Sequence, residues 1–358
     1  MNDKREFKNI MVTGGAGFIG SNFIRHVLGK TGFKGRIVNF DALTYAGNPR
    51  SLDDVAAKFG DRYVFVKGDI RNPDEIRKAL GDYAIDAICH FAAESHVDRS
   101  IVSPGDFIET NINGTYNLLQ AARERGDAFS RFHHVSTDEV FGSLGPQGYF
   151  SETTPYQPHS PYSASKASSD HIVRAYHDTY GLDVTISNCS NNYGPYQFPE
   201  KLIPLMILNA SEGKPLPVYG EGLNVRDWLH VEDHCAAIWT VITRAAPGAT
   251  YCVGGRSELR NIDVVRRICA LVEKFRGPLP GGAPRASLIT HVADRLGHDQ
   301  RYAIDCSRLE RDFGWRQTHT AETGFEETVR WYLDNPGWVD SVRSGEYRRW
   351  IETYYANR

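Results

Sequence analysis

The sequence predicts an α/β fold, in which a doubly wound parallel sheet is followed by a smaller C-terminal region. The first half alternates short runs rich in β-branched and aromatic residues with helical patterns, which is typical of a parallel sheet covered by helices on both faces. After about residue 190, prolines and glycines cluster and the elements become shorter. We therefore expect one domain over residues 1–190, with some later segments crossing back, and a second over mainly residues 191–358.

Six strands are predicted in the first half, at residues 9–15, 36–40, 63–70, 84–93, 131–138 and 183–190. Helical patterns separate most of them, such as residues 73–80 and the long stretch 110–126. Residues 310–315 and 321–335 have the pattern of closing helices. Open α/β sheets bind ligands at the carboxyl ends of their strands, so we expect the functional site there.

Composition and charge exclude several classes of protein. A net charge of −3 gives no electrostatic case for binding nucleic acid or an anionic membrane. No apolar run approaches the ~20 residues of a membrane span, and the charged N-terminus leads straight into a strand, so we expect no signal peptide. The 6 cysteines contain no CxxC pair and the 13 histidines show no ligand spacing. We expect a cytoplasmic protein with reduced cysteines and no metal site.

The stretch MVTGGAGFIGSN, which follows the first strand and opens a helix, predicts a dinucleotide site. Gly14, Gly17 and Gly20 allow a tight turn and a close approach of the backbone to a pyrophosphate at the helix N-terminus. Asp41 ends the second strand, where an acid accepts hydrogen bonds from the adenosine ribose and repels a 2′-phosphate. We expect a Rossmann-type domain that binds NAD rather than NADP. Asp69 ends the third strand, near an adenine or as the N-cap of the next helix.

The stretch SPYSASKASSDH places Tyr162 and Lys166 on one face of a helix, four residues apart. A free tyrosine has a pKa of about 10 and is no base near neutrality. A neighbouring ammonium and the positive nicotinamide both favour the phenolate. Such a tyrosine accepts a proton from a hydroxyl group while the carbon that carries it gives hydride to NAD.

Taken together, these motifs resemble the extended short-chain dehydrogenase/reductases that act on nucleotide sugars. The finer resemblance is to the dTDP-glucose 4,6-dehydratase family, and it spans nearly the whole chain. It rests on TGGAGFIGSN, DALTYAGN, HFAAESHVDRSI, STDEVFG, SPYSASKA, NNYGPYQFPEKLIP, GLNVRDWLHVEDH and DRLGHDQRYAID, in that order. Leu296 stands where the family usually has proline, and Cys252 where asparagine is more usual.

The resemblance implies a hydro-lyase of deoxysugar biosynthesis. Oxidation of the sugar at C4 makes a ketone, which acidifies the C5 hydrogen, and the C6 hydroxyl then leaves as water. This elimination needs a base and an acid with different protonation states, and Asp138 and Glu139 supply two adjacent carboxyls after a strand. The resemblance assigns Glu139 as the base, Asp138 as the acid and Thr137 as the hydroxyl beside Tyr162 at the sugar O4. Hydride returns to C6, so that NAD acts as a catalyst.

The resemblance also implies the binding residues. Besides the three glycines, Tyr162 and Lys166, the residues that match NAD contacts are Phe18, Ile19, Asp41, Leu43, Thr44, Asp69, Ile70, Ala92, Thr110 and Asn192. The nucleotide-sugar pocket matches Ser95, Thr137, Asn191, Lys201, Leu202, Pro217, Tyr219, Arg226, Asn261, Arg295 and His298. Arg226 and Arg295 are suited to clamp a diphosphate, and Tyr219 offers apolar surface beside a pyrimidine.

The partners implied are dTDP-glucose and a second copy of the chain, with no nucleic acid and no membrane. In the family, the helices around residues 105–125 and 162–180 pair across a two-fold axis, and here Ile112, Tyr116, Leu119, Ile172, Val173 and Tyr176 supply apolar surface. Alternatives are a 4-epimerase, a UDP-sugar decarboxylase, a dehydratase of another nucleotide sugar, and a non-catalytic NAD-binding sensor. The paired acids disfavour an epimerase, and the presence of Tyr162 and Lys166 disfavours a sensor.

Overall fold

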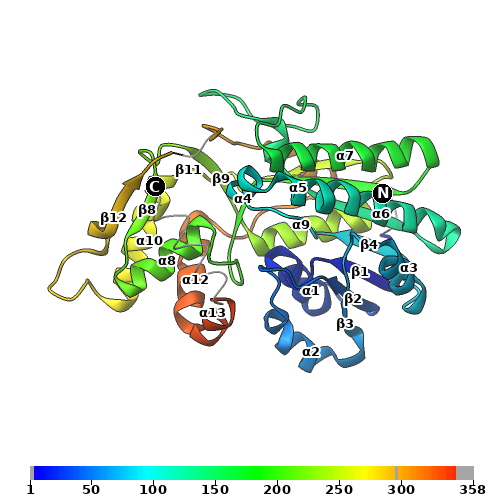
Figure 1. The fold of residues 1–358 in the computed structure, drawn as a ribbon, viewed down its shortest axis with the longest axis horizontal. Coiled ribbons are helices and arrows are strands. Elements are labelled where there is room, and N and C mark those ends of the chain that lie inside the picture. The colour runs from blue at the N-terminus through cyan, green and yellow to red at the C-terminus, as the bar shows by residue number, and fades with distance from the viewer. Residues whose placement is uncertain (1–3, 295–296, 344–358) are drawn as a thin grey trace.

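A seven-stranded parallel sheet forms the larger part of the computed structural model, which describes residues 4–294 and 297–343 (Figure 1). Its strands, in spatial order, are β10 (Thr250–Val253), β6 (Val184–Cys189), β5 (Arg131–Thr137), β4 (Ala87–His90), β1 (Asn9–Thr13), β2 (Arg36–Asp41) and β3 (Tyr63–Lys67). All six strands predicted in the first half belong to it. Every pairing in this sheet is parallel, so the carboxyl ends of the strands lie at one edge.

Helices cover both faces of this sheet, which confirms the predicted doubly wound fold. One face is covered by α3 (Pro73–Asp82), α6 (Gly114–Glu124) and α7 (Pro161–Tyr180), and the other by α1 (Phe18–Lys30), α2 (Asp53–Phe59) and α9 (Val231–Arg244). The buried strand side chains alternate between these two apolar layers: Met11 and Ile88 pack with the first group, and Ile10 and Cys89 with the second. Burial on both faces explains why these strands read as continuous apolar runs.

Short helical pieces connect these elements. They are η1 (Pro49–Leu52), η2 (Gly60–Arg62), α4 (Val97–Val102), α5 (Pro104–Phe107), η4 (Gly126–Ala128), η5 (Asp138–Phe141) and η6 (Arg285–Leu288). The stretch predicted as one helix over residues 110–126 begins as a π-helical segment, η3 (Ile108–Asn113), and continues as α6. Such π segments are frequent at functional sites.

Helix α7 has strong signals at both ends, which fixes where its side chains emerge. Ser160 and Ser163 form a reciprocal capping box, Pro161 occupies the first helical position, and Gly181 ends the helix in a left-handed conformation with φ of 69°. Tyr162 and Lys166 therefore lie in the first two turns, next to the carboxyl end of β5.

The remaining elements form a smaller body beside the sheet, on the left of Figure 1. It contains the strands β11 (Glu258–Arg260), β9 (Val225–His230) and β7 (Asn191–Tyr193) in one small sheet and β12 (Ile289–Val292) with β8 (Leu216–Tyr219) in another. Its helices are α8 (Leu202–Glu212), α10 (Asn261–Arg276), α12 (Ala321–Asp334) and α13 (Pro336–Val342). A separate apolar core joins α8, α10 and α12, with Ile207, Ile268 and Phe325 fully buried.

Three elements that come after residue 190 belong to the large domain: β10, α9, and α11 (Ser307–Phe313), which packs against β10 and α9. Strand β10 pairs in parallel with β6, and α9 packs against α1. The strand patterns of the first half gave no indication of β10. Within the described residues, no helix is both long and apolar enough to cross a membrane. All six cysteines are buried and free, including Cys252 in β10.

Candidate active site

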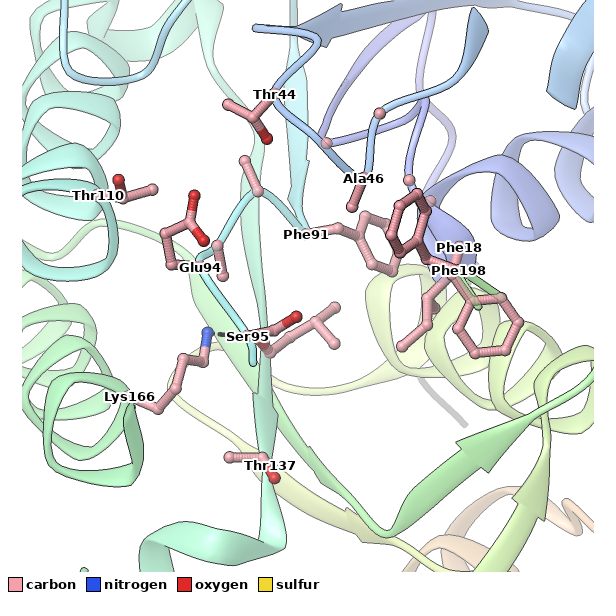
Figure 2. Close-up of a pocket in the computed structure, with 18 of the residues that line it drawn as sticks. Phe18, Thr44, Ala46, Phe91, Glu94, Ser95, Thr110, Thr137, Lys166 and Phe198 are labelled. Carbon is pink, nitrogen blue, oxygen red and sulfur yellow. Dashed lines mark hydrogen bonds between the residues drawn. The ribbon is translucent and has the colours of Figure 1, made fainter. Parts of the chain in front are cut away.

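A cavity of about 370 Å³ lies at the carboxyl ends of the sheet strands. It is lined from several distant segments: the turn before α1, the loops after β2, β3 and β4, the end of β5, the start of α7, and residues 189–201. In Figure 2, Thr110, Glu94 and Lys166 lie on one side of the cavity, and Phe18, Phe91 and Phe198 gather on the other. The site therefore lies at the edge that the strand order predicts.

The glycine turn between β1 and α1 is too tight for larger residues. Gly14 has a φ of +68°, and a Cβ there would collide with the backbone of Ala92. A Cβ on Gly20 would overlap the carbonyl oxygen of Gly14. The helix N-cap is Gly17, which has no side chain to cap the first N–H groups of α1. This end of α1 is therefore open to an anion such as a pyrophosphate.

Asp41 ties this turn to the loop that follows β2. Its Oδ2 accepts a hydrogen bond from Ala16 N at 2.9 Å, and its Oδ1 accepts one from Leu43 N at 2.8 Å. Burial raises the pKa of Asp41, while these two N–H groups lower it. The carboxyl group has lone pairs left for a ribose, which agrees with a dinucleotide whose adenosine lies over β2.

Most of the residues predicted to bind the cofactor line the cavity: Gly14, Gly17, Phe18, Ile19, Gly20, Asp41, Thr44, Asp69, Ile70, Ala92, Thr110, Tyr162, Lys166 and Asn192. Leu43 is not among the lining residues and acts through its backbone N–H on Asp41. Asp69 does not cap α3, because Asn72 accepts hydrogen bonds from Asp74 N and Glu75 N in that position. Asp69 instead pairs with Arg71 at 2.6 Å, which lowers its pKa against the opposing effect of burial.

The two adjacent acids begin a short 3₁₀ helix directly after β5. Asp138 is buried and Glu139 is partly buried, and both line the cavity. Burial, followed by the charges of Glu139 and Asp227, raises the pKa of Asp138 well above its ordinary value. Its Oδ1 accepts a hydrogen bond of 3.4 Å from Thr137 Oγ1, and its Oδ2 is buried without a hydrogen-bond partner among the described residues. The raised pKa favours the protonated form of Asp138, in which the carboxyl group can donate a hydrogen bond.

Tyr162 and Lys166 line the same cavity but make different contacts. Burial raises the pKa of Tyr162 well above its ordinary value, an effect that the neighbouring Thr137 hydroxyl only partly offsets. Lys166 Nζ donates to the carbonyl oxygen of Val135 at 2.9 Å, and burial lowers its pKa to about 8.

The residues predicted to bind the nucleotide sugar fall into two groups. Ser95, Thr137, Asn191 and Lys201 line the cavity, and Lys201 Nζ donates to the Ser95 carbonyl oxygen at 2.8 Å. Leu202, Pro217, Tyr219, Arg226, Asn261 and His298 lie outside its lining. Tyr219 reaches toward the large domain, with its hydroxyl 3.4 Å from Asp98 Oδ2, and its ring is 6.1 Å from that of His298.

Arg226 is engaged with backbone in this structure. Its Nη1 donates to the carbonyl oxygen of Val225 at 2.8 Å and its Nη2 to that of Asp299 at 2.9 Å. The guanidinium group lies 4.1 Å from the ring centroid of Tyr302. The expected diphosphate clamp of Arg226 with Arg295 stays a prediction, because Arg295, like the Leu296 substitution, lies outside the described residues.

Several lining residues were not predicted. They include Phe91, Glu94, Ser136, Gln197, Phe198 and Glu200. Burial raises the pKa of both Glu94 and Glu200, and Tyr45 donates to Glu200 at 2.9 Å. Glu94 in HFAAESH and Glu200 in FPEK could have been recognised as candidate site residues, because each is a carboxylate among apolar residues. Only the folded structure shows that these two residues line the same cavity.

A second cluster lies outside this cavity. The ligand atoms of His230, His319 and Glu327 lie within 4.8 Å of one another, a group that the histidine spacing did not suggest. However, His230 Nδ1 accepts a hydrogen bond from Glu232 N at 3.4 Å, which leaves the ring proton on Nε2. The two histidine rings also stack, 3.8 Å apart. This arrangement disfavours convergent ligation of an ion by both rings.

Comparison with known proteins shows the family to which the chain belongs. The family model described as GDP-mannose 4,6 dehydratase matches residues 11–328. The dTDP-glucose 4,6-dehydratase of Neisseria meningitidis serogroup B is 55% identical, over 95% of this chain and 98% of that protein, and dTDP-glucose 4,6-dehydratase 1 of Escherichia coli K12 is 53% identical, over 98% and 99%.

Among solved structures, DesIV, a dTDP-glucose 4,6-dehydratase from Streptomyces venezuelae with NAD and TYD bound, is 47% identical. It superposes with a TM-score of 0.85, over 92% of this chain and 98% of that one. The identities and coverages are far above those at which only a fold is shared. The chain therefore belongs to the GDP-mannose 4,6 dehydratase family and, within it, to the dTDP-glucose 4,6-dehydratases.

Proposed function

We propose that this protein is an NAD-dependent dTDP-glucose 4,6-dehydratase, a hydro-lyase that makes dTDP-4-keto-6-deoxyglucose for deoxysugar biosynthesis. The observation that carries this proposal is the pair Asp138–Glu139, which lines the same cavity as Tyr162 and Lys166. Oxidation or epimerisation at C4 needs only the tyrosine and lysine with a hydroxyl donor. Two further carboxyl groups are what an elimination across C5–C6 requires.

The dinucleotide half of the cavity suits NAD. The tight turn at Gly14 to Gly20, the open N-terminus of α1 and the acid Asp41 provide for a pyrophosphate and an unphosphorylated ribose. When bound, NAD supplies a hydride acceptor for C4 and later the hydride donor for C6. Asp41 holds the ribose end, and Lys166 and Tyr162 lie at the opposite end of the site.

Tyr162 removes the proton of the C4 hydroxyl. Because burial keeps this tyrosine a neutral phenol in the ligand-free protein, the phenolate needs compensating positive charge. The Lys166 ammonium, one helical turn along α7, and the oxidised nicotinamide provide it. Thr137 Oγ1 orients the sugar O4 beside Tyr162.

The elimination divides between the two acids. Glu139 removes the C5 proton, and Asp138 donates its proton to the departing C6 oxygen. The raised pKa of Asp138 suits the second role, because a general acid must retain its proton at the working pH. The unpaired Asp138 Oδ2 provides a free donor or acceptor for the leaving oxygen.

The nucleotide binds toward the smaller body. Lys201 and Asn191 line the cavity where the two parts meet, and Asn191 Oδ1 is buried without a hydrogen-bond partner among the described residues. Tyr219 and His298 lie beyond it, and Asn261 begins α10. We therefore propose that the sugar binds over β5 and α7 and that the base binds beside β8.

We also propose a homodimer. The apolar side chains most exposed on α4, η3, α6 and the end of α7 are Ile101, Val102, Ile108, Tyr116 and Tyr180, with exposed fractions from 37% to 78%. These elements lie together on one outer face (Figure 1). Leu119, Val173 and Tyr176, which were expected at this surface, pack in the core of the large domain instead. A second copy covers the exposed set.

We place the protein in the cytoplasm because its six cysteines are all free. A reducing compartment keeps such thiols unpaired.

The decisive experiment is incubation of the purified protein with dTDP-glucose. We expect a product that is lighter by one water and shows the alkaline absorbance of a 4-keto-6-deoxy sugar. UDP-glucose and GDP-mannose serve as matched substrates. A C4 epimer as product would indicate a 4-epimerase, and loss of carbon dioxide would indicate a decarboxylase. Faster turnover of GDP-mannose would indicate a dehydratase of another nucleotide sugar.

A further inference from the structure

Three titratable residues form a row along one face of α7. Tyr162, Lys166 and Asp170 follow one another at intervals of four residues, so that each lies one turn after the last. Asp170 has no exposed surface and Lys166 is 5% exposed. The proposed mechanism uses the first two residues and gives no role to the third.

Asp170 is a buried carboxylate held by neutral donors. Its Oδ2 accepts hydrogen bonds from Tyr156 OH at 2.7 Å, Ser136 Oγ at 2.9 Å and Asn188 Nδ2 at 3.1 Å. These donors stabilise the anion without cancelling its charge. Burial by itself raises the pKa of Asp170, but contact with His134, the charge of Lys166 and the hydrogen bond from Tyr156 together lower it. A full negative charge therefore lies in the interior next to α7.

One imidazole nitrogen lies between this anion and the catalytic lysine. His134 Nε2 is 3.2 Å from Asp170 Oδ1 and 3.4 Å from Lys166 Nζ. Burial lowers the pKa of His134 to about 4, so the ring is neutral near pH 7. The neutral imidazole therefore lies between the ammonium group of Lys166 and the carboxylate of Asp170.

We propose that Asp170 is a positioning residue that holds Lys166 as an ammonium ion, acting across the neutral ring of His134. An isolated ammonium buried in the protein interior loses its proton readily, because burial disfavours the charged form. A buried carboxylate nearby offsets that penalty. The effect of Asp170 on the charge of Lys166 does not depend on the proposed function. Its consequence for catalysis does, because the proposed mechanism needs a charged Lys166 to support the Tyr162 phenolate.

The surroundings of Lys166 single out Asp170. The titratable groups that face it are His90 on β4, His134 on β5, Cys189 on β6, and Tyr162 and Asp170 on α7. Burial lowers the pKa of Lys166 to about 8, and the charge of Asp170 is the largest effect that raises it. Cys189 also raises the pKa of Lys166, but burial raises the pKa of its own thiol well above the ordinary value, so the thiol is neutral near pH 7. The two histidines are neutral.

The test is to titrate Lys166 directly. Nuclear magnetic resonance of protein with isotope-labelled lysine side chains reports each ammonium, and the Lys166 signal is identified by its loss in Lys166→Met. We expect Lys166 to titrate near pH 8 in the native protein. In Asp170→Asn, which keeps the side-chain size, the pKa should fall by about 1–3 units. Tyr156→Phe removes one hydrogen bond to the carboxylate but keeps its charge, and should leave the Lys166 titration within about half a unit.

Turnover supplies a second readout. The alkaline limb of kcat/KM should move to lower pH in Asp170→Asn, so that activity lost at neutral pH returns in mild acid, and it should stay in place in Tyr156→Phe. An equal loss at every pH would mean a structural role for Asp170 and overturn the proposal. The proposal would also be overturned if Lys166 in the native protein is already uncharged at neutral pH. That measurement needs no variant, so it holds even if Asp170→Asn does not fold. The titration needs no substrate, so its outcome is independent of whether dTDP-glucose is turned over.

Discussion

Thr137 donates a hydrogen bond of 3.4 Å to Asp138 Oδ1, while the second oxygen of the same carboxyl group is buried with no hydrogen-bond partner in the described part of the chain. The acid is thus fixed on one side and open on the other. This asymmetry has consequences for both stability and chemistry.

Asp138→Asn should stabilise the protein at neutral pH while abolishing most turnover. An unfolded aspartate ionises near pH 4, whereas the folded Asp138 keeps its proton to a much higher pH. Between these two values the folded state binds more protons, so the free energy of unfolding falls as the pH rises. Asparagine does not ionise and avoids this loss, which we expect to be worth about 1–3 kcal/mol at pH 7. Thermal unfolding of both proteins from pH 4 upward measures it, and a stability gap that does not widen with pH contradicts the protonated state of Asp138.

Glu139→Gln should oxidise the sugar but fail to eliminate water. Tyr162 acts before Glu139 is needed, so the reduced nicotinamide should accumulate on the enzyme and be visible by its near-ultraviolet absorbance. Loss of one acid–base group costs about 10²–10⁴-fold in turnover. Glu6→Gln, an exposed glutamate distant from the cavity, is the matched control. Turnover of Glu139→Gln at the native rate would remove Glu139 from the mechanism.

Gly20→Ala should lose bound NAD, and Gly29→Ala should not. Both glycines lie in α1, but a Cβ on Gly20 overlaps the Gly14 carbonyl oxygen, whereas nothing lies within 4 Å of a Cβ on Gly29. Alanine at Gly29 should instead stabilise the helix by about 0.5–1 kcal/mol. The amount of NAD that remains with each purified variant checks the prediction. Equal retention would mean that the turn does not grip the pyrophosphate.

Deuterium placed at C4 of the sugar should appear at C6 of the product. The glycine turn, Asp41, Tyr162 and Lys166 line one cavity, so we expect a cofactor bound there to stay in place between the two hydride transfers. Added unlabelled NADH should not dilute the label. Release of deuterium into the free cofactor would indicate a dehydrogenase with an exchangeable cofactor instead of a closed cycle.

Tyr116→Asp should convert a dimer into a monomer. Tyr116 is 48% exposed on α6, and a charge there is costly to bury in an apolar interface. Tyr149, which is 61% exposed in the loop after η5, provides the control, because Tyr149→Asp leaves the α6 and α7 surface intact. Molar mass in solution at micromolar concentration distinguishes the two. A native protein that is monomeric under these conditions would refute the dimer.

The parts of the molecule that could be predicted are those with local signals. The glycine turn before α1, the capping of α7 and the acids after β5 each follow from a few consecutive residues. Strand β10 was not foreseen, because a four-residue run cannot reveal that it pairs with β6, some sixty positions earlier. The contact of His134 with Asp170 was likewise invisible, because it exists only once α7 has packed on β5. The family resemblance assigned Arg226 to the diphosphate, and its hydrogen bonds to the backbone carbonyls of Val225 and Asp299 likewise appear only in the fold.

The place of β10 at the edge of the sheet has a consequence for how the chain matures. Until residues 250–253 have left the ribosome, the backbone of β6 is unpaired on one side, and an open strand edge of this kind recruits other strands. Synthesis proceeds at about 5–20 residues per second, so the nascent large domain spends several seconds in that state. A chain that terminates between β6 and β10 should therefore aggregate instead of forming a smaller folded protein. Cofactor that binds early to the completed β1–α1 turn would stabilise the nascent domain while the β6 edge is unpaired.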